Sequence, residues 1–121
     1  MKINKELMKG STSILILSLL EKRDMYGYQI TQELKKQSEN IFELKESTLY
    51  PMLHGLENES AIASYWFDAD NGKRRKYYQI TPLGKKLLIE KKREWKTYSN
   101  AVNTIIGSVS SITAFRGACY E

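Results

Sequence analysis

The sequence predicts a mainly α-helical fold that carries one small β-hairpin. Three observations support it: a stripe of leucines at helical spacing over residues 47–59, two strand-like runs over 62–67 and 74–80, and Thr81 followed by Pro82 at the start of a long helical pattern. The resulting order is helix, helix, helix, hairpin, helix. This is the order of a winged helix-turn-helix with a long C-terminal dimerisation helix added to it.

The first half of the chain contains two predicted helices and their connections. A first helix is expected over residues 5–22, and its stretch 14–17 is apolar on nearly every side, which is typical of a helix at the centre of a small core. Residues 24–28 are expected to form a short connection, and a second helix continues to about Gln37 with one apolar face. Residues 42–44 have the composition of a very short strand.

The third predicted helix runs from about Ser47 to Glu59 and turns its leucine stripe inward. Pro51 fits best in the first turn of a helix, so the helix is predicted to start near Ser47 or Thr48, both of which can act as N-caps. The opposite face carries hydroxyl, imidazole and amide groups and consists of Ser47, Tyr50, Pro51, His54 and Asn58. Such groups hydrogen-bond base edges and phosphates in the major groove, although an ordinary solvated helix face has the same composition.

The predicted hairpin ends in a basic tip. Asn71 and Gly72 are residues that supply the positive φ angles of hairpin turns, and four consecutive cations, Lys73–Lys76, follow them. Because strand residues alternate between faces, two of these cations are expected to point one way and two the other. A basic tip can follow phosphates or enter the minor groove, or it can be a charged edge that prevents aggregation. Together with a polar third helix, it favours binding to double-stranded DNA.

The last helix has the pattern of a helix that packs along another helix. Its apolar residues recur at alternating three- and four-residue steps, with Lys91 as the one polar interruption. They give a predicted dimer seam of Leu88, Trp95, Tyr98, Val102 and Ile105, with Val109 and Ile112 at its far end. The alternative is packing on the first helix of the same chain, which is expected for Leu83 and Leu87.

Length and charge agree with this organisation. The chain has 121 residues, which is enough for one domain, and a net charge of +5, which favours a polyanionic partner. The predicted parts are a winged helix-turn-helix DNA-binding domain over 1–81, a dimerisation helix over 82–107 and a flexible tail over 108–121.

Enzyme, metal and membrane functions are not expected. His54 is the only histidine and Cys119 the only cysteine, so the sequence offers no nucleophile–base pair and no zinc-ligand spacing, and it has no glycine-rich phosphate loop. The apolar run of the first helix is too short to span a bilayer, which points to a cytoplasmic protein with no membrane partner. The main alternative to DNA binding is a winged-helix module that binds another protein, and the four cations of the hairpin argue against it.

Three motifs resemble the PadR family of transcriptional regulators: the segments Met25–Ile30, Ser47–Glu57 and Gly72–Thr81, which occur in this order. The resemblance extends from about Leu7 to Ile106, and the single helix after the hairpin is similar to the shorter branch of the family. It implies that the protein forms a homodimer through the last helix and that this dimer represses transcription. In some relatives a small aromatic or drug-like effector releases the DNA.

The resemblance also implies roles for individual residues. Tyr26 and Tyr28 would lie near the DNA backbone or brace the turn between helices. The groove-facing set would be Ser47, Thr48, Tyr50 and His54, and the hairpin contacts would be Lys73, Arg74 and Arg75, next to Lys76. Trp95 would flank an effector at the dimer interface, unless it is only a packed seam residue.

The chain departs from the family pattern at two places. Gly55 replaces a basic residue, and Ser60 replaces a glycine that ends the third helix. The loss of the basic residue predicts one phosphate contact fewer. The family pattern also predicts that the third helix begins one or two residues before the start inferred from Pro51.

Overall fold

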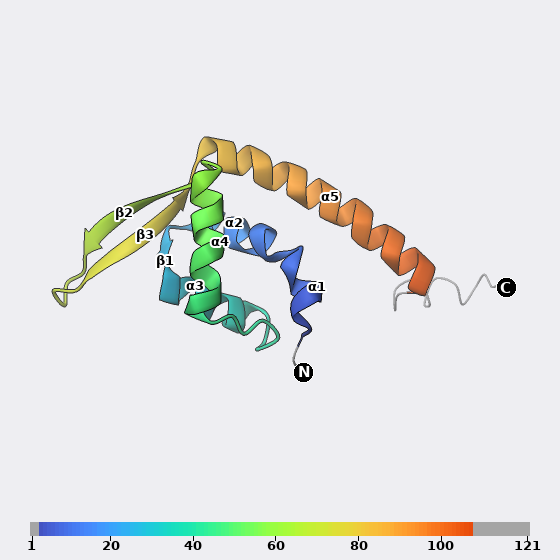
Figure 1. Cartoon of the computed structure of the whole chain (residues 1–121), viewed down its shortest axis with the longest axis horizontal. Coiled ribbons are helices and arrows are strands. Elements are labelled where there is room, and N and C mark those ends of the chain that lie inside the picture. The colour runs from blue at the N-terminus through green and yellow to red at the C-terminus, as the bar shows by residue number, and fades with distance from the viewer. Residues whose placement is uncertain (1–2, 108–121) are drawn as a thin grey trace. The chain divides into compact units, whose positions relative to one another are not determined.

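The computed structural model describes residues 3–107, so the predicted tail 108–121, with Val109, Ile112 and Cys119, lies outside the described residues. The elements are α1 (Lys5–Lys9), α2 (Thr12–Lys22), β1 (Met25–Tyr26), α3 (Gly27–Gln37), α4 (Glu46–Asn58), β2 (Ile62–Asp68), β3 (Arg74–Ile80) and α5 (Pro82–Ile106), as shown in Figure 1. Two compact units are present, one up to Ile89 and one from Glu90 onward. The order of helices and hairpin confirms the predicted fold class.

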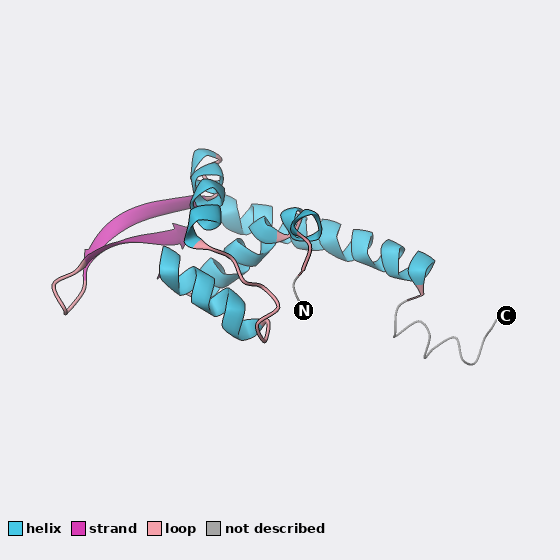
Figure 2. Cartoon of the chain, turned by 60° about the horizontal axis from the view of Figure 1, so that its bottom comes forward, coloured by secondary structure: helices cyan, strands magenta, loops and turns pink. Residues whose placement is uncertain are grey.

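The sheet has three antiparallel strands in the order β1-β3-β2. The hairpin register runs from Ile62 opposite Ile80 to Asp68 opposite Arg74, and Met25 of β1 pairs with Tyr78. The two hairpin strands therefore have the predicted bounds, with β2 one residue longer. β1 was not predicted, because its residues fall in what the sequence indicates as a plain connection. Figure 2 shows the hairpin in magenta, curving away from the helices α2, α3 and α4.

The core of the first unit lies where α2, α3 and α4 meet the sheet. Its buried apolar residues are Ile16, Leu17, Leu19, Leu20, Met25, Ile30, Leu34, Leu49, Leu53, Leu56, Ala61, Ile62, Tyr78 and Leu88. The central position predicted for the apolar run of α2 is confirmed, as is the inward face of α4. The prediction for Leu88 is wrong. It was assigned to the dimer seam, but it is only 1% exposed and is buried in the core of its own chain.

The first helix is broken, contrary to the prediction of one helix over 5–22. α1 ends at Lys9, Gly10 is its C-cap, and α2 begins at Thr12. The hydroxyls of Ser11 and Thr12 both donate to the carbonyl of Met8, at 3.1 and 2.9 Å. Hydroxyl side chains that compete for a backbone carbonyl next to a glycine, which has low helix propensity, explain the break.

α4 begins at Glu46 with Lys45 as its N-cap, and no side-chain hydrogen bond caps it. The start at Ser47 or Thr48 inferred from Pro51 is therefore wrong, and the earlier start implied by the family resemblance is confirmed. Pro51 lies inside the helix, where it offers no N–H to the carbonyl of Ser47.

The end of α4 places Ser60 in a backbone conformation that favours glycine. Its φ is 63°, its N–H donates to the carbonyl of Glu57, and the N–H of Ala61 donates to the carbonyl of Leu56. These two hydrogen bonds form a Schellman motif with a serine at the position usually occupied by glycine. The chain thus keeps the family's helix end without its glycine.

Two local predictions are wrong: the short strand over 42–44 and the positive φ angle of Asn71. Residues 42–44 form no strand; Phe42 and Leu44 instead pack partly buried against the core, and the N–H of Phe42 donates to Ser38 Oγ at 2.8 Å. In the hairpin turn only Gly72 has a positive φ, of 83°. Asn71 acts through its side chain, whose Oδ1 accepts from the N–H of Lys73 at 3.0 Å.

α5 begins as the sequence predicts. Thr81 Oγ1 accepts from the N–H of Gly84 at 2.9 Å, so Thr81 is the N-cap ahead of the first-turn Pro82. In the second unit the helix carries exposed apolar residues, among them Trp95 at 43% and Ile105 at 85% exposure. No helix within residues 3–107 combines the length and the apolar character needed to cross a membrane.

Candidate nucleic-acid interface

The outward face of α4 is exposed as predicted. All of the residues expected there, together with Thr48 and Gly55, are exposed to solvent: Ser47, Tyr50, Pro51, His54 and Asn58. The face is polar because the leucines of the same helix, Leu49, Leu53 and Leu56, occupy the buried side. A helix of this kind presents hydrogen-bonding side chains on one side while the core fixes its position.

Tyr50 is held in place by two neighbours. Its hydroxyl donates to Glu46 Oε2 at 3.0 Å, and its ring lies against Gly27, where an added Cβ would be 2.9 Å from the Tyr50 oxygen. Burial of the ring, followed by the hydrogen bond and the charge of Glu46, raises the pKa of the Tyr50 phenol. Tyr50 therefore forms a fixed wall between the beginnings of α3 and α4.

The hairpin divides its cations between two faces. Residues in register share a face, so Arg74 and Lys76 lie with Trp66 and Tyr78, and Arg75 lies on the other face with Phe67. The Arg74 guanidinium is 5.4 Å from the centre of the Trp66 ring, and Lys76 Nζ is 5.7 Å from that of Tyr78. The three cations within β3 alternate, but the predicted division into two and two is not found, because Lys73 lies exposed in the turn before the strand.

A groove of about 670 Å³ connects these parts. Its walls come from the starts of α3 and α4 and from the hairpin: Tyr26, Gly27, Tyr28, Glu46, Tyr50, Trp66, Lys73, Arg74, Arg75, Lys76 and Tyr78. Of the residues predicted to contact DNA, seven line this groove, and Ser47, Thr48 and His54 lie on the exposed face of α4 outside its lining. The lining holds four cations and one carboxylate, that of Glu46, so the groove suits an anionic partner.

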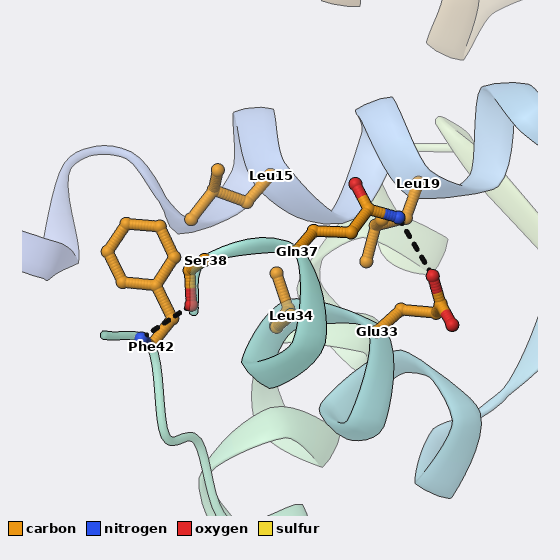
Figure 3. Close-up of a pocket in the computed structure, with 7 residues that line it drawn as sticks. All are labelled: Leu15, Leu19, Glu33, Leu34, Gln37, Ser38 and Phe42. Atoms are coloured by element: carbon orange, nitrogen blue, oxygen red, sulfur yellow. Dashed lines mark hydrogen bonds between the residues drawn. The ribbon is translucent and has the colours of Figure 1, made fainter. Parts of the chain in front are cut away.

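A second, smaller pocket of about 230 Å³ has a different character. Figure 3 shows its lining from α2, α3 and the loop after α3: Leu15, Leu19, Glu33, Leu34, Gln37, Ser38 and Phe42. Its polar groups are engaged with one another or with the backbone, since Gln37 Nε2 donates to Glu33 Oε1 at 2.8 Å. That hydrogen bond is the main cause that lowers the pKa of Glu33. The pocket shares no residue with the groove.

Sequence analysis missed several residues of the groove. Trp66 is 57% exposed there, Glu46 bonds Tyr50, and Gly27 gives the Tyr50 ring its space. The two-residue period of β2, which places Trp66 on the same face as Ile62 and Ser64, is a signal that would have found the tryptophan. The roles of Glu46 and Gly27 depend on how α3 meets α4, which no local pattern encodes. The described residues hold no cluster of three or more potential metal ligands.

Comparison with known proteins identifies the family. The model of the transcriptional regulator PadR-like family matches residues 16–90. The chain is 40% identical over 93 residues to an uncharacterised protein of Lysinibacillus sphaericus, a match that covers 77% of this chain and 85% of that protein.

Solved structures agree. A PadR family transcription regulator from Clostridium difficile R20291 matches with 39% identity and a TM-score of 0.70 over 80% of this chain and 99% of that one. A transcriptional regulator from Clostridium thermocellum matches with 35% identity and a TM-score of 0.76 over 83% of this chain and 97% of that one. The fold, the groove between α4 and a basic hairpin, and these matches lead to one conclusion: the chain belongs to the PadR-like family of DNA-binding transcriptional regulators and is not an enzyme.

Proposed function

We propose that this protein is a cytoplasmic repressor that binds operator DNA sequence-specifically as a homodimer. The observation that carries the proposal is the groove, in which the polar start of α4 lies opposite the cations of the hairpin. In the proposed complex the exposed face of α4 reads base edges, through Ser47, Thr48, Tyr50 and His54, and Tyr28 lies at the DNA backbone. The winged-helix part over 1–81 makes these contacts, and the helix over 82–107 joins the two subunits.

The hairpin supplies the electrostatic part of the affinity. Lys73 and Arg74 are exposed, and Lys76 is on the groove side of β3. Arg74 Nε lies 3.9 Å from Asp68 Oδ1, with the two side chains 69% and 83% exposed. Such an exposed pair contributes little, so it leaves Arg74 available for a phosphate. Each phosphate that a cation neutralises adds about 0.9 to the slope of log K against log salt concentration.

The double variant Lys73→Ala/Arg74→Ala is expected to weaken operator binding and to reduce the salt slope by about 3.6, because each of the two subunits loses two phosphate contacts. Fluorescence anisotropy on a labelled duplex from upstream of the protein's own gene, at about 50 and 200 mM salt, measures both quantities. The control is Lys85→Ala/Lys86→Ala, which removes the same charge from exposed positions of α5.

The outcomes separate the alternatives. Tighter binding to the upstream duplex than to a scrambled one, with loss only in the hairpin variant, supports a sequence-specific regulator. Equal losses in both variants mean that only the overall charge matters. Failure to bind either duplex at low salt would reject the DNA-binding groove and favour a module that binds protein.

The dimer also suggests a place for an effector. Trp95 is 43% exposed, and its ring centre lies 6.1 Å from that of Tyr98, so two aromatic faces are available on one stripe of α5. We place a planar apolar effector against Trp95 at the dimer interface, where its binding would change the spacing of the two hairpins and weaken DNA binding.

Trp95 fluorescence provides the test, because the chain has two tryptophans and Trp66→Phe leaves Trp95 alone. In that background, the planar and uncharged aromatic probe pyrene is expected to quench Trp95 and to lower the anisotropy of bound operator. A DNA response that persists unchanged in Trp95→Ala would remove the effector site from this residue.

A further inference from the structure

The face of the sheet opposite the core carries a continuous aromatic cluster. Tyr77 stands at its centre, with ring centres of Tyr26 at 5.4 Å, Tyr65 at 5.8 Å and Phe67 at 5.6 Å. The register places all four residues on one face, because Tyr26 pairs with Tyr77 and Tyr77 with Tyr65. Aromatic pairs at these distances contribute beyond the area they bury. The cluster therefore ties all three strands together on the side away from the core.

Arg75 also lines the groove, but its direct contacts are with this cluster and not with Trp66 or Tyr78. Its guanidinium carbon lies 4.5 Å from the centre of the Tyr26 ring, and Nη1 donates to the Tyr26 hydroxyl oxygen at 2.9 Å. Arg75 is half-buried, whereas Arg74 beside it is exposed. The guanidinium is thus already engaged by a ring face and a hydrogen bond within its own chain.

Asp24 makes a matching connection on the other side of Met25. Its Oδ2 accepts from the Tyr65 hydroxyl at 2.7 Å, and this hydrogen bond is the main cause that raises the pKa of Tyr65 to about 12. The residues on either side of the buried Met25 are therefore fixed to β2 and to β3. Because β1 leads directly into α3 at Gly27, these contacts hold the hairpin against the helix start that forms the other wall of the groove.

We propose that Arg75 is a positioning residue: with Asp24, Tyr26, Tyr65 and Tyr77 it forms an outer-face clamp that sets the hairpin relative to α3 and α4, and it neutralises no phosphate itself. The proposal rests on the proposed DNA interface and deepens it, because it divides the basic run into contacts and support. Lys73, Arg74 and Lys76 are the contacts. Arg75 acts through Tyr26, and the tyrosine braces the turn instead of meeting the DNA backbone.

The clamp can be tested first without DNA, by hydrogen exchange of the hairpin amides in the free protein. Arg75→Ala is expected to speed their exchange about tenfold, since local opening becomes easier when the contacts that hold a segment are removed. Tyr26→Phe removes only the acceptor oxygen and is expected to act in the same direction to a smaller extent. Arg74→Ala is the control, because its side chain is exposed and its contacts are with Trp66 and Asp68, on the opposite face of the hairpin from the clamp.

The salt dependence of operator binding then separates support from contact. Arg74→Ala removes one phosphate contact from each subunit and is expected to lower the salt slope of the dimer by about 1.8, whereas Arg75→Ala weakens binding several-fold and leaves the slope unchanged. Arg75→Lys keeps the charge but loses the planar guanidinium, so it is expected to behave like Arg75→Ala.

A fall of the slope by about 1.8 in Arg75→Ala, restored by Arg75→Lys, would overturn the proposal and make Arg75 a phosphate contact in each subunit. If the unaltered protein binds no duplex, the proposed function fails, and hydrogen exchange alone decides the clamp. Unchanged exchange in both Arg75→Ala and Tyr26→Phe would then reject it.

Discussion

Gly84→Ala is expected to lower the free energy of unfolding by about 3 kcal/mol, at the upper end of the range for overpacked sites. A Cβ at Gly84 would lie 2.0 Å from the carbonyl oxygen of Ala61 and 2.8 Å from the side chain of Ile80. The first of these is backbone, and it is doubly fixed, because the carbonyl of Ala61 also accepts from the N–H and the hydroxyl of Thr81. Relief of the overlap therefore requires α5 to move away from the start of β2.

Thermal unfolding at a fixed protein concentration measures this effect. A loss of this size corresponds to a fall in Tm of more than about 10 °C in a domain of this length. The control is Gly55→Ala, the same substitution at an exposed helical position where no atom lies within 4 Å of the added Cβ. It is expected to raise stability by about 1 kcal/mol through helix propensity. Equal shifts in the two variants would show that the contact at Ala61 is not tight.

The contrast between these glycines shows what the sequence could predict. Thr81 and Pro82 predicted the start of α5 correctly, because an N-cap and a first-turn proline act on the residues next to them. Residue 84 is a glycine because the backbone of Ala61, next to the start of β2, passes too close to α5 for a side chain. This contact joins segments that are distant in the sequence, so no local pattern predicts it. In the same way the leucines of α4 were assigned correctly from their spacing, while the space that Gly27 leaves for Tyr50 was not found.

Short or ambiguous signals account for the remaining errors. β1 has two residues, too few for any periodicity, and it exists because β3 offers a free edge to pair with. The alternation of the basic hairpin was predictable, but only the register shows that Arg75 is the residue on the outer face. Leu88 was assigned to the seam because it lies seven residues before Trp95, and such a spacing has the same form whether a helix packs on its own chain or on another.

Replacement of an apolar seam residue by aspartate is expected to separate the proposed dimer. Tyr98 is 62% exposed, Ile105 85% and Ile106 70%, which is a large apolar surface for one helix to leave in water. In Ile105→Asp, pairing of the two α5 helices would bury a charge with no partner, at a cost of several kcal/mol. Light scattering coupled to size exclusion, at about 10 μM protein, is expected to give twice the chain mass of 14.0 kDa for the unaltered protein and the single mass for this variant.

Thr104→Asp is the matched control, because it adds the same charge one residue away. Successive helix positions are turned by about 100°, which takes Thr104 off the apolar stripe, and its hydroxyl donates to the carbonyl of Asn100 at 2.8 Å. Thr104→Asp is therefore expected to remain dimeric. A monomeric unaltered protein, or a dimeric Ile105→Asp, would place the subunit contact elsewhere.

The same pair of variants tests why the protein would need two subunits. Two linked recognition helices bind two half-sites as one unit, so the monomeric variant is expected to lose on the order of 100-fold in operator affinity although its groove is intact. Its binding to a non-specific duplex is expected to change far less, because that affinity depends on the cations of each hairpin alone. If Ile105→Asp is monomeric and still binds the operator as tightly as Thr104→Asp, one α4 and one hairpin supply the whole affinity, and dimerisation serves regulation instead of recognition.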